Sequence, residues 1–330
     1  MTAPLLAFCI AALVALHTTP LMRTAALKFG IVDHPDGRLK HQPEPVPYLG
    51  GLAVYLAYLV ALGVVFEFNH AVLGVLLAGT LMVLVGLIDD LGVLSPSEKL
   101  AGQFIAVAVL LKAGLYVQLT FLPAFVAFGL SIFWLLSVTN AVNIVDIMDG
   151  LAGGIAAIAA AFIAVIAVLN GRPTVAAMAA ALSGSLVGFL RFNSRPARIY
   201  LGDSGSLFIG MTLAALAMNG RYTVNNWVGM LTPAIVLAVP LFDLVFVSIV
   251  RLEKGLSPFR GSPDHFALRL RGAGMSVEGI VLASYLASFA VGSVGVAIMM
   301  APSEGLAAWI LAGFSAAMLC LAAVLRSLRR

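Results

Sequence analysis

Apolar runs about as long as a bilayer is thick dominate the chain. A helix needs roughly 17 to 25 mostly apolar residues to cross the hydrocarbon core, or fewer where protein encloses it. The pattern predicts an all-α, polytopic membrane bundle of about 11 transmembrane helices, forming one domain over residues 1–330. The predicted spans are 3–22, 48–66, 71–88, 100–115, 119–138, 151–169, 174–192, 204–219, 227–249, 277–300 and 305–325.

The basic residues between these runs fall mostly on one side. Eleven spans sort the connections into two sets, and 16 of the 19 Lys and Arg residues lie in one set. Only Lys112, Arg172 and Arg221 lie in the other. Since cytoplasmic loops carry an excess of Lys and Arg, the first set is predicted to be cytoplasmic, with the N-terminus outside and the C-terminus cytoplasmic. The net charge of +4 therefore reflects membrane topology and does not indicate a nucleic-acid partner.

Composition supports a membrane protein. Hydrophobic residues make up 62% of the chain and charged residues 10%, with a mean hydropathy of +1.06. Soluble domains carry about 25% charged residues. Ionisable groups are costly inside a membrane, so those that interrupt an apolar chain are candidates for function.

The stretch NAVNIVDIMDGLAGG carries polar residues at a regular spacing. Asn140, Asn143, Asp146 and Asp149 recur every third residue, which would form one polar stripe on a helix. A functional site and a solvated helix end capped by Asp149 and Gly150 both account for this pattern.

Two further acidic motifs flank apolar runs. Asp89 and Asp90 end the third run, where negative charge opposes the helix macrodipole, so local helix stability does not favour a pair there. Neighbouring carboxylates can divide the work, with one ionised beside a cation and the other exchanging a proton. In IYLGDSGSL, Asp203 or Ser204 is a candidate N-cap, but a carboxylate at a helix start can also share a metal ion with a bound phosphate.

The carboxylates of these motifs are predicted to converge at one membrane face. Such a cluster repels itself unless cations or protons relieve it. Oxygen ligands indicate Mg²⁺, or alternatively Mn²⁺, over zinc, and Mg²⁺ usually takes one or two carboxylates together with substrate phosphates. The pattern outlines a phosphoryl-transfer site. Its acids are Asp89, Asp90, Asp146, Asp149 and Asp203.

The first cytoplasmic connection, IVDHPDGRLKHQPEPVPYLGG, is too polar to be a span. One interpretation is a basic loop that fixes topology. The other is an arm that positions a phosphorylated substrate with Lys40 and His41, since Lys commonly holds phosphate as a point charge.

Four motifs, in this order, resemble one family: VDHPDGRLKHQ with PYLGGLA, then GLIDD, NAVNIVDIMDGLAGG and NSRPARIYLGDSGSL. The chain resembles the polyprenyl-phosphate N-acetylhexosamine-1-phosphate transferases over nearly its whole length. The resemblance implies transfer of a sugar 1-phosphate from a UDP-amino sugar to polyprenyl (undecaprenyl) phosphate, with Mg²⁺ and release of UMP. It implies a site on the cytoplasmic face of a bacterial inner membrane, where the product starts a cell-envelope glycan such as O-antigen.

The resemblance also assigns roles to residues. It implies that Asp203 is the Mg²⁺ ligand and that Asn143 is a second oxygen donor. Asp89 and Asp90 match the acidic pair associated with the lipid phosphate and catalysis; which of them acts on that phosphate stays open, as does a double displacement. The family also allows a homodimer.

Other matching positions lie near the nucleotide. The resemblance places Asp146, Asp149 and Asn193 there, and Tyr200 where an aromatic ring meets uracil. A ring beside a Mg²⁺ site can stack a base, although an interfacial tyrosine is the alternative explanation for Tyr200.

The loop RLEKGLSPFRGSPDHFALRLRGAG departs from the family pattern. Many members carry several histidines here, whereas this chain has His265 alone. His265 and Arg269 are expected to contact a diphosphate or sugar, and a solvated loop residue is the alternative explanation for His265. A second departure is Tyr48, where relatives often have Arg. Asp243, about two turns before Arg251, is expected to have a structural pairing role.

Two other functions compete with this prediction. A phospho-MurNAc-pentapeptide translocase belongs to the same superfamily, but the single-histidine loop fits the branch that uses smaller sugars better. A cation-coupled transporter is the second alternative. Transporters tend to place ionisable residues near the bilayer midplane, often within internal repeats, and neither feature is visible here.

Overall fold

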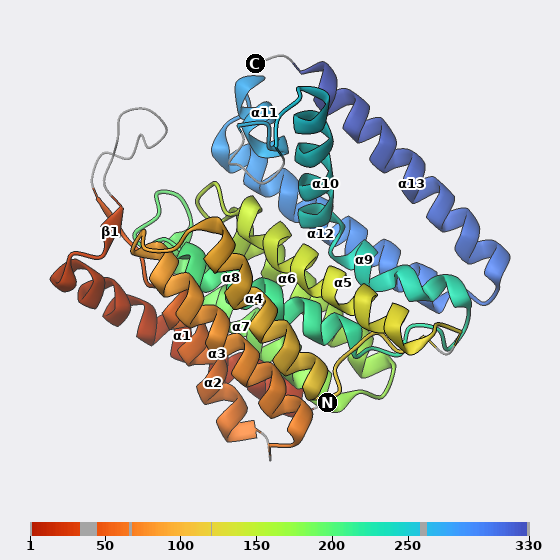
Figure 1. The fold of residues 1–330 in the computed structure, drawn as a ribbon, viewed down its shortest axis with the longest axis horizontal. Coiled ribbons are helices and arrows are strands. Elements are labelled where there is room, and N and C mark those ends of the chain that lie inside the picture. The colour runs from red at the N-terminus through yellow and green to blue at the C-terminus, as the bar shows by residue number, and fades with distance from the viewer. Residues whose placement is uncertain (1, 34–44, 66–67, 120, 258–262, 329–330) are drawn as a thin grey trace. The chain divides into compact units, whose positions relative to one another are not determined.

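The computed structural model describes the whole chain except residues 1, 34–44, 66–67, 120, 258–262 and 329–330 (Figure 1). Within the described part the protein is almost entirely helical, which confirms the predicted all-α class. The one sheet seen there is a hairpin that the sequence did not predict. Its strands β1 (Val32–Asp33) and β2 (Val46–Pro47) are antiparallel, with Val32 opposite Pro47.

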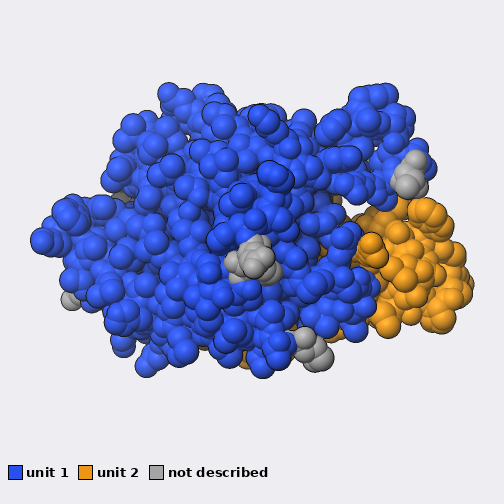
Figure 2. All heavy atoms as spheres, turned by 90° about the horizontal axis from the view of Figure 1, so that it is seen from below, with its two compact units in different colours: residues 1–220 blue, residues 221–330 orange. Residues whose placement is uncertain are grey.

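The helices divide into two compact units, residues 1–220 and 221–330, which Figure 2 colours separately. The prediction of a single domain stays a prediction. Unit 1 holds the hairpin, α1 (Thr2–Phe29), α2 (Gly50–Val65), α3 (His70–Asp90), α4 (Pro96–Lys112), α5 (Ala124–Val145), α6 (Leu151–Leu169), α7 (Pro173–Asn193) and α8 (Gly202–Met218). Unit 2 holds η1 (Trp227–Leu231), α9 (Thr232–Val236), α10 (Ala238–Glu253), α11 (Phe266–Gly272), α12 (Val277–Met300) and α13 (Glu304–Ser327).

Seven helices are long and apolar enough to span a membrane: α1, α3, α5, α6, α7, α12 and α13. The segments Trp227–Val236 and Ala238–Glu253, which meet at 76°, make an eighth span if they are counted together. The protein is therefore a multi-pass membrane protein. Every predicted run contains a helix, but α2 and α8 are short, so the number eleven and the orientation stay predictions.

The most enclosed helices lie in unit 1. In α7, 78% of the most apolar window is buried, whereas the corresponding value for α13 is 6%. A helix that is apolar all round is either packed inside protein or surrounded by lipid. We assign α7 to the first case, and the long apolar face of α13 suits lipid.

Helix α8 is buried along nearly its whole length and packs against α2, α3 and α5. Glycines allow two of these contacts. A Cβ added to Gly51 would lie 2.1 Å from the backbone N of Gly205, and one added to Gly86 would lie 2.3 Å from Cα of Ser204. Only glycine permits so close an approach of two backbones. The glycines of three motifs therefore fix where α8 begins.

Two local predictions were wrong. Asn140 and Asn143 are helical, but α5 ends at Val145, so Asp146 and Asp149 lie beyond it and the four residues form no single stripe. Neither Asp203 nor Ser204 is an N-cap, because α8 already begins at Gly202 and Leu201 occupies the cap position. At α8, contacts with α2 and α3 set the helix start, and the local capping preference does not.

The Gly51 contact gives a test of this packing. Gly51→Ala should lower the free energy of unfolding by about 1–3 kcal/mol, the usual cost of overpacking, because the added methyl group meets backbone that cannot rotate away. The matched control is Gly63→Ala on the same helix, where an added Cβ meets nothing within 4 Å. Thermal melting in one detergent compares them, and equal melting temperatures would contradict the close approach.

Candidate active site

Four helix ends meet at one end of unit 1. Helix α3 ends with Asp89 and Asp90, α4 carries Lys99 in its first turn, α5 carries Asn143 near its end, and α8 carries Asp203 in its first turn. These residues are joined by hydrogen bonds and ion pairs across chain separations of 10 residues, for Asp89 and Lys99, to 113 residues, for Asp90 and Asp203. The predicted convergence of the acidic motifs is therefore confirmed for Asp89, Asp90 and Asp203.

Lys99 is the centre of this cluster. Its Nζ lies 2.8 Å from Oδ2 of Asp89 and forms an ion pair with Oδ2 of Asp203. The same nitrogen donates a 3.3 Å hydrogen bond to Oδ1 of Asn143. The Lys99 and Asp89 side chains are 17% and 18% exposed, so the pair is accessible without being fully solvated. One ammonium group thus neutralises carboxylates from two helices that would otherwise repel each other.

Asn143 orients Asp203. Its Nδ2 donates to Oδ1 of Asp203 over 2.7 Å and to Oγ of Ser206 over 2.8 Å. With both amide hydrogens used in this way, the amide oxygen faces the cationic centre. Asn143 therefore contributes an oxygen on the side of the cluster where positive charge is held.

Asp90 has a different role from its neighbour Asp89. Its two carboxylate oxygens accept hydrogen bonds from the backbone N–H groups of Asp203, at 2.7 Å, and Ser204, at 3.2 Å. These are first-turn N–H groups of α8, which lack partners within the helix. A carboxylate there is stabilised by the helix macrodipole. Asp90 thus supplies, from α3, the cap that the sequence of α8 lacks.

Asp146 and Asp149 lie in the turn between α5 and α6. Asp149 accepts a 3.1 Å hydrogen bond from the backbone N–H of Ala197. Burial raises the pKa of Asp146 to about 8, and the negative charges of Asp203, Asp90 and Asp149 add to this effect. Asp146 is therefore within electrostatic range of the cluster.

Asn193, the last residue of α7, connects the turn before α6 to the loop that follows α7. Its Oδ1 accepts from the backbone N–H of Gly150 at 3.0 Å, and its Nδ2 donates to the carbonyl of Ile199 at 3.0 Å. The residue is 4% exposed. These contacts give Asn193 a role in shaping the site, and its predicted contact with a nucleotide stays a prediction.

Tyr200 forms an aromatic pair beside these aspartates. Its ring centroid lies 6.2 Å from that of Tyr48, with the planes tilted by 51°. Burial raises the pKa of Tyr200 to about 12, and the charges of Asp149, Asp33 and Asp146 contribute. The phenol is therefore neutral at physiological pH. Tyr48, the departure from the family pattern, supplies the second ring of this pair.

Unit 2 contains its own buried polar cluster. Asp243 is fully buried in α10; its Oδ2 lies 2.7 Å from Nδ1 of His265, and its Oδ1 accepts from the backbone N–H of Phe266 at 2.9 Å. The expected pairing role of Asp243 is confirmed, with His265 as the side-chain partner. Because Nδ1 is engaged, Nε2 is the ring nitrogen left for another contact.

Arg269 lies in the same unit, and its donors are engaged there. It donates from Nη2 to Oδ1 of Asp264 at 3.0 Å and from Nη1 to the carbonyl of Leu325 at 3.1 Å, and its guanidinium lies over the Phe246 ring. These contacts tie α11 to α10 and α13. The predicted contact of Arg269 with substrate stays a prediction, and so does that of His265.

Two predicted site residues, Lys40 and His41, lie outside the described residues. One central residue, Lys99, was missed by the sequence analysis. A signal for it exists: Ser95 and Glu98 form a capping box that marks the start of α4. A lysine in that first turn opposes the helix macrodipole, just as Asp89 and Asp90 do at the end of α3.

The donor set fits magnesium in chemical type. Asp89, Asp203 and Asn143 all direct an oxygen at Lys99 Nζ, which marks a point where positive charge is stabilised. Mg²⁺ prefers such hard oxygen ligands and usually needs only one or two carboxylates besides phosphates and water. Among the described residues, no group of three or more His, Cys, Asp or Glu side chains is placed to hold a metal ion.

Fold and site together define a class: a multi-pass membrane protein with an oxygen-rich, lysine-neutralised acidic site of the kind that handles phosphates. Comparison with known proteins agrees. Residues 72–221 match the model of glycosyl transferase family 4. A decaprenyl-phosphate N-acetylglucosaminephosphotransferase of Mycobacterium leprae (strain TN) is 32% identical over 314 residues, covering 84% of this chain and 79% of the relative.

Two other relatives carry similar names. A probable undecaprenyl-phosphate N-acetylglucosaminyl 1-phosphate transferase of Bacillus subtilis (strain 168) is 29% identical over 294 residues, covering 86% of this chain and 81% of the relative. An undecaprenyl-phosphate alpha-N-acetylglucosaminyl 1-phosphate transferase of Salmonella typhi is 29% identical over 290 residues, covering 84% and 78%. The chain belongs to glycosyl transferase family 4, among the polyprenyl-phosphate N-acetylhexosamine-1-phosphate transferases, which confirms the resemblance seen in the motifs.

The different contacts of Asp89 and Asp90 give a test. Asp90→Ala should lower the free energy of unfolding by about 0.5–2 kcal/mol, the usual cost of losing a helix cap, because two N–H groups of α8 lose their acceptor. Asp89→Ala is the matched control and should cost less, because Asp89 caps no helix and Lys99 keeps Asp203 as a partner. Thermal melting compares the two, and a larger loss in Asp89→Ala would contradict the assignment.

Proposed function

We propose that this protein transfers N-acetylglucosamine 1-phosphate from UDP-N-acetylglucosamine to polyprenyl phosphate and releases UMP. The observation that carries the proposal is the cluster of Asp89, Lys99, Asn143 and Asp203 at one end of unit 1. The named sugar in the matched relatives is N-acetylglucosamine in each case, which supports this sugar over other N-acetylhexosamines.

Asp203 and Asn143 would hold the metal ion, with Asp89 beside them. When bound, Mg²⁺ neutralises charge on the phosphates of the UDP-sugar as UMP leaves. Asp203 suits this role because Asn143 and the Asp90 cap fix its side chain and its backbone in place. Preorganised ligands of this kind need little rearrangement when the substrate binds.

Asp89 is the carboxylate that acts on the lipid phosphate. Asp90 is occupied by two backbone N–H groups, whereas the Asp89 side chain meets only other side chains of the cluster, those of Lys99 and Asp203. Asp89 would orient the polyprenyl phosphate, or accept its proton, as one phosphate oxygen attacks the sugar-bearing phosphorus. The bond between that phosphorus and the oxygen bridging to the uridine-bearing phosphate breaks, and UMP departs with the bridging oxygen.

Lys99 solves an electrostatic problem in this reaction. Two anionic substrates must approach a site that already contains Asp89 and Asp203, and like charges at such distances repel strongly. The Lys99 ammonium offsets that repulsion and can shift its contacts to a phosphate oxygen, because Lys holds phosphate as a mobile point charge. Lys40 and His41 are proposed to add further contacts to the substrate phosphates.

The nucleotide is proposed to lie against Tyr200, near Asp146 and Asp149. The tilted Tyr48–Tyr200 pair offers an aromatic surface for uracil, and the carboxyl groups offer hydrogen-bond partners for the nucleoside. His265, fixed by Asp243, is proposed to contact the sugar or diphosphate with Nε2.

The cluster is proposed to face the cytoplasm of a bacterial inner membrane, where the product would start a cell-envelope glycan such as O-antigen. The distribution of Lys and Arg supports this orientation, because the connections at the end of unit 1 that carries the cluster belong to the basic set. A phospho-MurNAc-pentapeptide translocase and a cation-coupled transporter are not favoured. The names of the matched relatives give N-acetylglucosamine, and Asp89, Asp90 and Asp203 lie in the last or first turn of their helices.

The reaction can be tested by UMP release from the purified protein with undecaprenyl phosphate and a panel of UDP-sugars. We expect UMP from UDP-N-acetylglucosamine only when both the lipid and Mg²⁺ are present, and none with EDTA. Asp203→Asn should abolish turnover while the protein stays folded. A fully active Asp203→Asn enzyme would overturn the assignment of Asp203 as a metal ligand. UMP formation without lipid would overturn the assignment of polyprenyl phosphate as the acceptor.

The role of Lys99 needs a separate variant. Lys99→Met should reduce kcat by about 10²-fold or more, the usual cost of removing one preorganised charge from a phosphoryl-transfer site. Lys112→Met, at the other end of the same helix, is the matched control and should keep wild-type activity. An active Lys99→Met enzyme would contradict a role for Lys99 in the reaction. The ammonium group would then only neutralise Asp89 and Asp203 in the absence of substrate.

Tyr200 can be tested through the nucleotide. Tyr200→Leu should raise KM for the UDP-sugar by about tenfold, since stacking of a base on an aromatic side chain is worth about 1–3 kcal/mol. Tyr200→Phe keeps the ring and should stay within about twofold of wild type. If both variants raise KM for polyprenyl phosphate instead, the ring contacts the lipid substrate.

A further inference from the structure

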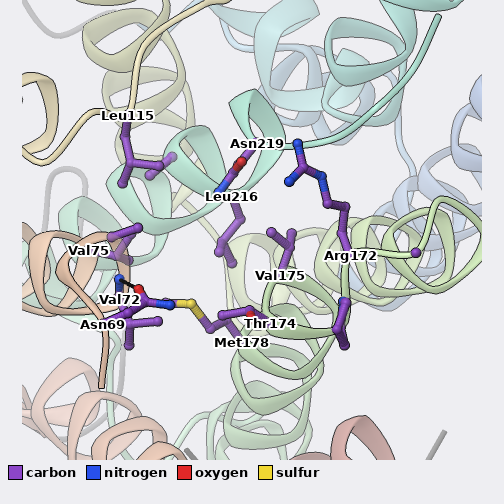
Figure 3. A pocket seen from close by; sticks show the side chains of 14 residues that line it. Asn69, Val72, Val75, Leu115, Arg172, Thr174, Val175, Met178, Leu216 and Asn219 are labelled. Atoms are coloured by element: carbon purple, nitrogen blue, oxygen red, sulfur yellow. Dashed lines mark hydrogen bonds between the residues drawn. The ribbon is translucent and has the colours of Figure 1, made fainter. Parts of the chain in front are cut away.

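A cavity of about 240 Å³ lies at the end of unit 1 opposite the acidic cluster (Figure 3). It is bounded by the starts of α3 and α7, by the end of α8 and by Leu115. Since α3 has 21 residues, about 30 Å of helix separates its start, at this cavity, from Asp89 and Asp90. The cavity is therefore a second site, apart from the one assigned to the reaction.

The floor of the cavity is apolar and its rim is polar. The floor side chains are almost fully buried, and the rim is formed by Asn69, Thr174, Asn219 and Arg172. Figure 3 shows the Arg172 side chain extending from the start of α7 toward Asn219. A site with an apolar floor and a polar rim suits an amphiphile, because each part of the ligand meets surface of its own kind. The floor consists of Val72, Val75, Leu115, Val175, Met178, Ala215 and Leu216.

The charge of the rim favours an anion. Among the described residues that line the cavity, Arg172 is the one cation and none is acidic. The Nε of Arg172 is buried, and in the described part of the chain no atom is placed to accept its hydrogen. A buried guanidinium N–H without an acceptor is costly and unusual. The N-terminal ends of α3 and α7 add positive potential, and α7 has no side-chain cap.

We propose that this cavity binds the headgroup phosphate of an anionic membrane phospholipid. Arg172 contacts a phosphate oxygen, with Asn219 beside it, and the first acyl carbons cover the apolar floor. The phosphate supplies the acceptor that Nε lacks, and the guanidinium fork matches its geometry. Since the acidic cluster is proposed to face the cytoplasm, this lipid belongs to the opposite leaflet.

The test measures lipid binding to the purified, delipidated full-length protein by native mass spectrometry. Dioleoylphosphatidylglycerol is the probe. Two control ligands divide its features: dioleoylglycerol has the acyl chains without the phosphate, and inorganic phosphate has the anion without the chains. We expect the first phosphatidylglycerol to bind about tenfold more weakly to Arg172→Gln than to wild type, the effect of losing one charge-assisted hydrogen bond. Lys112→Gln, a cation predicted on the same side of the membrane, is the matched control and should bind like wild type.

A second variant tests the cavity itself. Val75→Phe places a larger side chain in the floor while leaving Arg172 intact, and it should weaken the same binding event. Both variants should retain lipid-dependent UMP release, which shows that they fold and separates this site from the reaction. Equal phosphatidylglycerol affinity in wild type and Arg172→Gln would overturn the proposal. Inorganic phosphate binding as tightly as the lipid would also overturn it, because the site would then hold a free anion.

Discussion

The ion pairs of Lys99 with Asp89 and Asp203 are the contacts on which the proposed site depends. They join the end of α3, the start of α4 and the start of α8, and they place a single positive charge between carboxylates that would repel each other. A partly exposed cluster of this kind adds little to stability. The cluster matters for the chemistry, because a site that attracts a metal ion and two phosphates must hold acids and a mobile cationic side chain together.

The precision of this arrangement comes from the backbone. Gly51 and Gly86 let α2 and α3 touch the first turn of α8, and Asp90 caps that turn through two N–H groups. Asp203 therefore sits on a helix start whose position is set by two neighbouring helices, and Asn143 fixes its side chain. The adjacent acids Asp89 and Asp90 look equivalent in the sequence, yet one faces the cation and the other holds the helix.

The features that the sequence predicted well are those that follow from the cost of placing polar groups in an apolar chain. Acids interrupting apolar runs identified Asp89, Asp90 and Asp203, and helices formed at every predicted run. The sequence predicted poorly what depends on contacts between distant helices. The cap on α8 comes from α3, and the pairing role expected of Asp243 is filled by His265, a partner that the sequence did not name. Lys99 was missed because a lone lysine near a helix start looks like a topology signal until its partners are known.

The central claim is that a phosphorus atom moves with the sugar, and one labelling measurement tests it directly. The purified protein would be given undecaprenyl phosphate, Mg²⁺ and UDP-N-acetylglucosamine labelled with ³²P in the phosphate next to the sugar. Transfer of sugar 1-phosphate predicts that the label enters the lipid fraction, one atom for each UMP released. Label that stays in the water-soluble nucleotide, with sugar in the lipid and UDP released, would show transfer of the sugar alone and contradict the role given to the acidic cluster.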